Sequence, residues 1–205
     1  MEPRVIYLVR HGKIALEDEQ RRYVGQIDLA LTEEGRRQAR ALSRRFEHVA
    51  LDAIVSSDLS RSRETAEIVG AAAGVTPISR PDLREVAMGE WEGCSFRDVA
   101  RRFPDAFKAR GEDLGNFCVP GGESFADCGR RSVAAFEELS RTFAGNILII
   151  GHAGVNRLIL CHVLGMPVSS LFRLGQDYGC INVIQCSNAG NQVRLLNGRG
   201  RSGHR

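Results

Sequence analysis

The sequence lacks the long apolar runs of a membrane protein. A bilayer-spanning helix needs about 20 consecutive apolar residues, and no stretch of the 205 residues approaches that length. The amino terminus also lacks the apolar segment of a signal peptide, because the short apolar run over 5–9 ends at once in Arg10. We therefore expect a cytoplasmic protein that has no membrane partner.

Paired metal ligands are missing as well. The six cysteines form no CxxC pair, and no HExxH pattern is present. These absences predict a protein without a metal site, and no other cofactor is expected. Because a secretion signal is lacking, reduced thiols in the cytosol are expected. Cys161 and Cys180 stand in apolar surroundings and are expected in the core.

The chain has little net charge once its last residues are set aside. Its 28 basic and 25 acidic residues give a formal net charge of +3. The tail over 198–205 holds three arginines and no acidic residue, so the rest of the chain is balanced. A neutral body gives no reason to expect nucleic-acid binding. The tail has no apolar residue and is expected to be disordered.

Length and composition predict one globular domain over residues 1–197. Apolar residues make up 43% of the chain and charged residues 26%, which suffices for a substantial core. Short β-branched runs alternate with amphipathic stretches. This alternation predicts an α/β fold, a three-layer α/β/α sandwich with a central, mostly parallel sheet.

The predicted elements follow from hydrophobic periodicity and capping residues. Thr32 is expected to cap the first helix and Asp58 the second. The segment over 86–122 looks irregular and rich in glycine and charge, and it is expected to form a lid over the strand ends. Strands are predicted at 5–9, 53–57, 147–150, 181–186 and 192–196, the last two joined in a hairpin around 188–190, and helices at 33–47, 59–73, 123–143 and 154–164.

Two of the predicted strands end in a histidine. The strand over 5–9 runs into Arg10-His11-Gly12, and the strand over 147–150 runs into GHAG at 151–154, which contains His152. A lone histidine at a strand end is more often structural than functional. Ligands bind at the carboxyl ends of parallel strands, however, and two such ends side by side would bring the imidazoles together. Two imidazoles and an arginine indicate a bound anion, most simply a phosphate.

Arg61 falls in the first turn of the helix predicted over 59–73. A helix amino terminus favours anions, so a cation there is unexpected unless an anion is bound. Arg61 is therefore either part of the anion site or an ordinary helix residue. Arg63 is expected on a different face, in solvent or in a salt bridge.

An acidic partner for this site is expected in the segment over 83–93. Glu85, Glu90 and Glu92 all lie there, and composition does not choose among them. Trp91, the only tryptophan of the chain, is expected to pack beneath the loop.

Together these motifs resemble the histidine phosphatase superfamily, the relatives of cofactor-dependent phosphoglycerate mutase. The resemblance covers nearly all of residues 4–186. It rests on LVRHG at 8–12, DLALTEEGRRQA at 28–39, SSDLSRSRETA at 56–66, LREVAMGEWEG at 83–93 and GHAG at 151–154. It implies a phosphoglycerate mutase-like fold and a phosphoric monoester hydrolase that acts through phosphohistidine.

The resemblance also implies a role for each matching residue. His11 would be the nucleophile, Arg10, Arg61 and His152 would hold the phosphoryl group, and Glu85 would donate the proton. Arginine suits this task because its planar fork binds two oxygens at once. A glutamate beside a phosphate dianion should hold a proton more readily, because like charges oppose ionisation. Phosphate or substrate contacts are expected from Arg10, Gly12, Lys13, Tyr23, Arg61 and Ala153.

The resemblance indicates the substrate less directly than it indicates the reaction. The interval from Glu85 to Glu123 is shorter than the insertion of the mutases, which favours a phosphatase. RRYVGQIDLAL at 21–31 and PGGES at 120–124 resemble α-ribazole phosphatases of cobalamin synthesis, which remove the 5′-phosphate from α-ribazole phosphate. A small phosphorylated metabolite is therefore the expected partner, and a homodimer is compatible with the sequence.

One departure from the family pattern bears on substrate choice. Lys13 stands where many relatives have glutamate, no asparagine follows it within 13–20, and Val24 stands where some broad-specificity phosphatases have glutamine. The phosphate thus loses neutral hydrogen-bond donors. Lys13 either replaces them or is a solvated cation.

Several alternatives stay open. A broad-specificity phosphatase or a mutase-type enzyme would share the same residues. A non-catalytic scaffold that binds phosphorylated ligands would fail to turn over p-nitrophenyl phosphate. A metal-dependent hydrolase built from His11, His152 and carboxylates would lose its activity to a chelator.

Overall fold

A six-stranded mixed sheet forms the centre of the molecule. The structure is a computed structural model that describes residues 4–16, 20–187 and 190–199. The strand order is β3-β2-β4-β1-β5-β6. The first four of these strands run parallel, and β5 pairs in an antiparallel manner with both β1 and β6. The strands are β1 (Arg4–Arg10), β2 (Leu51–Ser56), β3 (Ile78–Ser79), β4 (Asn146–Gly151), β5 (Ile181–Ser187) and β6 (Gly190–Gly198).

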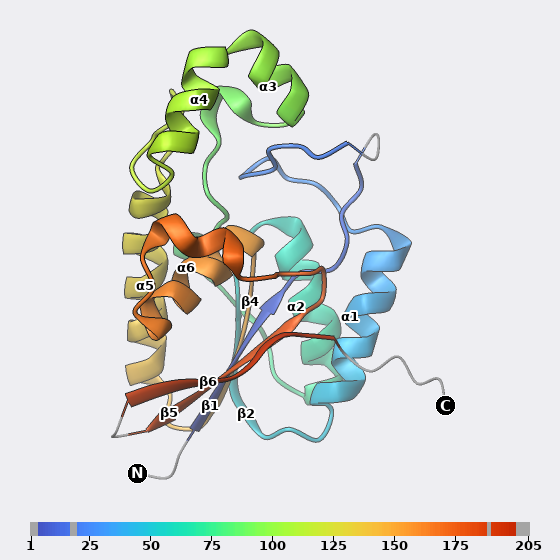
Figure 1. Ribbon diagram of the computed structural model, residues 1–205. Helices are drawn as coiled ribbons and strands as arrows, with labels where there is room; N and C mark the ends of the chain where they lie inside the picture. The colour runs from blue at the N-terminus through green and yellow to red at the C-terminus, as the bar shows by residue number, and fades with distance from the viewer. Residues whose placement is uncertain (1–3, 17–19, 188–189, 200–205) are drawn as a thin grey trace.

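Helices cover both faces of this sheet, which confirms the predicted α/β/α sandwich (Figure 1). On one face, α1 (Glu33–Phe46) and α2 (Ser60–Ala73) pack over Val9, Ile54 and Leu148. On the other face, α5 (Phe125–Thr142) and α6 (Ala153–Leu164) pack over Leu8, Val55 and Ile149. Neighbouring residues of one strand thus face opposite layers, as the pleat requires.

The helix starts were predicted with mixed success. Thr32 caps α1, since its hydroxyl accepts from the amide of Gly35. The prediction that Asp58 caps the second helix is wrong, because α2 begins at Ser60 after Leu59, which provides no side-chain cap. Asp58 instead forms an ion pair with Arg84. A distant guanidinium competes better for that carboxylate than the nearby amides do.

The long helix begins two residues later than predicted. Its first residue is Phe125, and the preceding Ser124 forms a reciprocal capping box with Asp127. Glu123, where the helix was predicted to start, lies before the cap and takes part in an ion pair described below.

The segment over 86–122 is not irregular, contrary to the prediction. It contains η2 (Gly89–Trp91), α3 (Phe96–Arg102) and α4 (Pro104–Glu112). Figure 1 shows α3 and α4 beyond one end of the sheet. Both helices are short, and α4 buries none of its residues fully, so their periodicity is weak. Trp91 is buried beneath them against Tyr23, Val99 and Val119, as predicted.

The remaining elements are the short helices η1 (Pro81–Leu83) and η3 (Val168–Arg173). Cys161 and Cys180 are buried, as predicted, and all six cysteines are free thiols. Within the described ranges, no helix is long and apolar enough to span a membrane.

The end of the chain departs from its prediction in part. β5 and β6 pair in an antiparallel manner, as predicted. Residues 188–189, where the turn was predicted, lie outside the described residues. The disordered tail was predicted to begin at 198. Gly198 instead pairs with Ile181, and Arg199 forms an ion pair with Asp177. Residues 200–205 lie outside the described residues.

Candidate active site

Two histidines meet at the carboxyl end of the parallel strands. β1 and β4 are hydrogen-bonded neighbours in which Arg10 is level with Gly151. His11 and His152 directly follow these two residues, and their ring centroids lie 5.1 Å apart. The predicted juxtaposition of the two imidazoles is confirmed.

His11 presents one defined ring nitrogen for chemistry. Its Nδ1 lies 2.7 Å from the carbonyl oxygen of Gly12. A carbonyl only accepts, so Nδ1 carries the proton and Nε2 keeps its lone pair. Burial lowers the pKa of His11 well below its usual value, and the cations Arg10 and Arg61 lower it further. The ring is therefore neutral and able to act as a nucleophile.

Gly12 is required by packing between elements. A Cβ at this position would lie 2.4 Å from the carbonyl oxygen of Gly35, at the start of α1. The amide of Gly12 donates to Thr65 Oγ1 at 3.3 Å. The absence of a side chain at Gly12 thus allows the loop after β1 to pack closely against α1 and α2. Gly12, an expected phosphate contact, is not among the residues that line the cavity described below.

Arg61 is fully buried at the start of α2 and points into the site. Its terminal nitrogens donate to the carbonyl oxygens of Ile27 at 2.8 Å and Gly25 at 2.6 Å. Its Nε lies 3.3 Å from Nδ1 of His152. The geometry therefore favours the functional interpretation of Arg61. Arg63 is exposed and pairs with Glu67, as predicted.

Arg10 reaches the same cavity from the end of β1. One terminal nitrogen donates to the carbonyl oxygen of Gln176 at 2.7 Å. Its Nε is buried and has no hydrogen-bond partner among the described residues. A buried charged donor without a partner is costly, and an anion in the cavity would satisfy it.

His152 is held by a residue that the sequence did not single out. Its Nε2 lies 2.6 Å from Oγ of Ser57, the residue after β2. Because Arg61 donates to Nδ1, the proton of the neutral ring lies on Nε2 and is donated to Ser57. Burial lowers the pKa of His152 well below its usual value, and Arg61 and His11 add to this effect.

The structure selects one glutamate of three. Glu85 is buried and its carboxylate accepts from the amides of Gly154 at 2.9 Å and Val155 at 3.2 Å, at the start of α6. Glu90 is exposed. The carboxylate of Glu92 accepts from the amides of Gly25, Gln26 and Met88. Glu92 is not among the residues that line the cavity described below.

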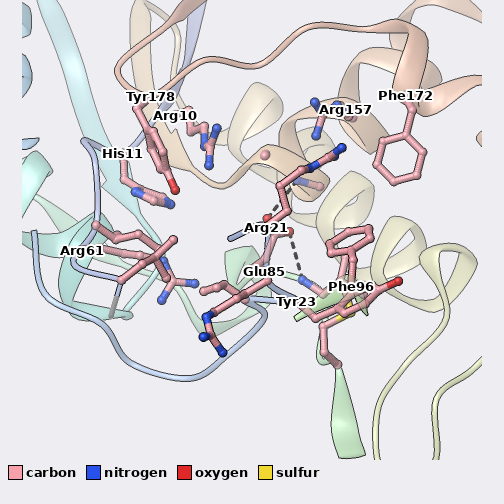
Figure 2. A pocket seen from close by; sticks show the side chains of 18 of the residues that line it. Arg10, His11, Arg21, Tyr23, Arg61, Glu85, Phe96, Arg157, Phe172 and Tyr178 are labelled. Carbon is pink, nitrogen blue, oxygen red and sulfur yellow. Dashed lines mark hydrogen bonds between the residues drawn. The ribbon is translucent and has the colours of Figure 1, made fainter. Parts of the chain in front are cut away.

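Arg10, His11, Arg61 and Glu85 line a cavity of about 400 Å³. His152 is fully buried and is not among the residues that line it. Figure 2 shows Arg10, His11, Arg61 and Tyr178 at one end, with Glu85 between them and an aromatic wall at the other end. Glu85 is the only acidic residue among the described residues that line it, whereas six arginines do so: Arg10, Arg21, Arg22, Arg61, Arg110 and Arg157. This excess of cations suits an anionic ligand.

The aromatic wall contains Tyr23, which stacks on Phe96 with ring centroids 4.1 Å apart. The guanidinium of Arg110 lies over the ring of Tyr23 at 5.4 Å. Burial raises the pKa of Tyr23. Phe172, an exposed residue of η3, completes the wall near Arg157. Tyr23 is therefore brought to the cavity as predicted, and so is Ala153.

Lys13 is not brought to this cavity. Its Nζ lies 2.8 Å from the Glu34 carboxylate, and its side chain is half exposed. It lines a separate hollow with Arg37 and Gln38 over α1. The backbone of Lys13 is bound to α1, since its amide donates to Gln38. The side chain is thus directed toward that helix.

Sequence reasoning missed Ser57, Tyr178, Arg110, Arg157 and Phe172. Ser57 lies within a quoted motif and next to a strand end, a signal that could have singled it out. The other four come from α4, α6, η3 and the segment before β5. No local pattern marks them, because only the packing of these elements turns them toward the strand ends.

Comparisons with known proteins agree with this geometry. Residues 6–199 match the sequence profile of the histidine phosphatase superfamily, branch 1. The chain belongs to this family. It is 31% identical over 196 residues to an adenosylcobalamin/α-ribazole phosphatase of Salmonella typhimurium, covering 95% of this chain and 96% of the relative. It is 35% identical over 170 residues to a probable phosphoglycerate mutase of Yersinia pestis, covering 82% and 79% of the two chains.

Solved structures of phosphatases share its fold. A putative α-ribazole-5′-P phosphatase from Escherichia coli superposes with a TM-score of 0.88 at 27% identity, covering 98% of this chain and 99% of the other. A mycobacterial glucosyl-3-phosphoglycerate phosphatase superposes with a TM-score of 0.86 at 26% identity, covering 96% and 100%. The chain is thus a phosphatase with a phosphoglycerate mutase-like fold.

Proposed function

We propose that this protein hydrolyses phosphomonoesters through a phosphohistidine on His11. The observation that carries the proposal is the neutral His11 ring, with Nδ1 bound to the Gly12 carbonyl and the lone pair of Nε2 available inside a cavity lined by Arg10 and Arg61. A phosphoryl transition state spreads negative charge over three equatorial oxygens. Two guanidinium groups can stabilise that charge directly.

The reaction has two steps that share one acid–base residue. In the first, Nε2 of His11 forms a bond to phosphorus, the bond to the ester oxygen breaks, and protonated Glu85 gives its proton to the leaving oxygen. In the second, water attacks the phosphohistidine, the Glu85 carboxylate takes a proton from that water, and the phosphorus–nitrogen bond breaks. Inorganic phosphate leaves and Glu85 is again protonated.

We propose α-ribazole 5′-phosphate as the substrate. Similarity to the Salmonella typhimurium enzyme over nearly the full length of both chains supports this choice. The aromatic wall of Tyr23, Phe96 and Phe172 offers flat apolar faces for the benzimidazole base beyond the phosphate. Such a reaction would take place in the cytoplasm, as a step in the synthesis of cobalamin.

A second candidate is a phosphoglycerate-type ester. Arg110 and Arg157 both lie within 6.0 Å of the Phe172 ring at the far end of the cavity. Neither forms an ion pair with a carboxylate of the described residues, so an acidic group on the substrate would meet two cations there. The similarity to a probable phosphoglycerate mutase fits this alternative.

A trapping experiment tests the histidine mechanism. The protein is mixed with an excess of ³²P-labelled ester in the presence of a chelator, quenched in denaturant at alkaline pH, and digested. Acid-labile label is expected on the peptide that contains His11, and His11→Ala should lose activity by several orders of magnitude. His48→Ala, which changes an exposed histidine, is the matched control. Wild-type turnover in His11→Ala would refute the mechanism.

A substrate screen tests the choice of ester. It compares kcat/KM for α-ribazole 5′-phosphate, 3-phosphoglycerate and phosphoserine. The first is expected to be preferred. A clear preference for 3-phosphoglycerate would replace the proposed substrate and leave the histidine mechanism intact.

A further inference from the structure

Tyr178 lies at the phosphate end of the cavity and has no assigned role. The guanidinium of Arg10 lies over its ring at 3.7 Å, and its ring centroid is 5.6 Å from that of His11. Figure 2 shows the phenol directed toward His11 and Arg61. No described residue forms a hydrogen bond with its hydroxyl group. The side chain therefore brings an uncommitted donor to the place where a phosphoryl group would lie.

The segment that carries Tyr178 is tied to its surroundings on both sides. The amide of Gly179 donates to the carbonyl of His11, and the amide of Arg10 donates to the carbonyl of Cys180, both at 3.1 Å. The amide of Asp177 donates to Asn197 Oδ1 at 2.7 Å. Because these bonds join the segment to the end of β1 and to β6, the phenol is positioned before a ligand arrives. Such preorganisation is what makes a hydrogen-bond donor effective in a transition state.

We propose that the Tyr178 hydroxyl donates a hydrogen bond to a non-bridging oxygen of the phosphoryl group. The inference rests on the proposed phosphomonoesterase activity and adds a neutral donor to the cations of the site. The side chain of Lys13, the other candidate for this contact, is bound to Glu34 outside the cavity. The same ring that carries the hydroxyl covers the Arg10 guanidinium, so the two phosphate contacts are aligned by one side chain.

Tyr178→Phe tests the hydroxyl, because it keeps the ring over Arg10. A hydrogen bond to a charged phosphoryl group predicts that kcat/KM falls about 10- to 100-fold. The loss should be equal for p-nitrophenyl phosphate and for an alkyl phosphate, since the contact is to the group that both esters share. Calorimetry should show weaker binding of inorganic phosphate by about tenfold. Tyr7→Phe, a tyrosine of β1 that packs on Phe46, is the matched control.

Tyr178→Leu separates the hydroxyl from the ring. If Tyr178→Phe behaves as the wild type and only Tyr178→Leu is impaired, the ring alone matters and the proposal is overturned. Unchanged phosphate affinity in Tyr178→Phe would overturn it as well. If the wild-type protein hydrolyses no ester, the proposed function fails, whereas the phosphate titration still decides whether Tyr178 contacts the anion.

Discussion

Arg61 and His152 are joined before any ligand binds, with Nε of Arg61 3.3 Å from Nδ1 of His152. This contact requires an unprotonated Nδ1 and a neutral ring. An incoming phosphate dianion would offset the cations that oppose protonation of His152. It would also give Arg61 a stronger acceptor than the imidazole. We therefore expect a bound anion to weaken the contact between Arg61 and His152.

The buried histidines predict a loss of stability in mild acid. Burial holds the pKa of His11 and of His152 well below 6.5 in the folded protein, whereas both titrate near 6.5 when unfolded. Below about pH 6.5 the unfolded chain therefore binds more protons than the folded protein. The contribution of the neutral histidines to the free energy of unfolding is fully present above that pH and falls as the pH drops.

Denaturant unfolding of the ligand-free protein between pH 8 and pH 5 measures this effect. His11→Gln should lose less stability over that range than the wild type. His48→Gln, an exposed histidine, should keep the wild-type slope. Equal slopes for His11→Gln and the wild type would show that the His11 ring takes up its proton as readily in the folded state as in the unfolded chain.

Glu85→Gln should slow esters according to their leaving groups. An alkyl oxygen needs a proton to leave, so its hydrolysis should fall about 100-fold or more. p-Nitrophenyl phosphate should be affected much less, because its leaving group is stable as an anion. Glu90→Gln, on the exposed side of the same loop, is the control. Equal slowing of both esters would mean that Glu85 only supports the loop.

Lys13→Ala should behave as an ordinary surface substitution. Its ammonium group is bound to Glu34 and half exposed, so kcat/KM should change by no more than about 0.5 kcal/mol. Steady-state kinetics with several esters, with Lys108→Ala as the exposed control, measures the change. A rise in KM for every ester that corresponds to a loss of about 1–3 kcal/mol in binding free energy, the range for a charge-assisted contact, would instead show that Lys13 contacts the phosphate.

Arg131 should act as a positioning residue for Glu85. From α5 its guanidinium donates to the carbonyls of Asp82 at 2.8 Å and Glu85 at 3.1 Å. It also pairs with Glu123, whose carboxylate accepts from the amide of Ala87 at 2.9 Å. The pair therefore holds the loop that carries the proton donor.

Arg131→Lys keeps the charge but cannot make this set of contacts. It should slow alkyl esters about tenfold more than p-nitrophenyl phosphate. Arg130→Lys, at the neighbouring exposed position, should have no such effect. In a Glu85→Gln background the selective loss should vanish. If it persists there, Arg131 acts on the site by another route.

Predictions from the sequence succeeded where local pattern and chemistry coincide. The strands before His11 and His152 are short apolar runs, and both residues stand at the same edge of the sheet because β1 and β4 are parallel neighbours. The prediction failed where a distant partner intervened. Asp58 has the composition of a helix cap, but Arg84 takes its carboxylate.

The sequence by itself determined the layered fold, the histidines at the strand ends, and Arg10 and Arg61 as members of recognisable motifs. Periodicity and motif spacing depend only on neighbours in the chain. Only the tertiary structure decided which glutamate faces the cavity, that Lys13 lies outside it and that Tyr178 lies within it. The direction of each of these side chains is set by contacts with other elements, such as the amides of α6 at Glu85 and the Glu34 carboxylate at Lys13. Those partners are brought near only when the chain folds.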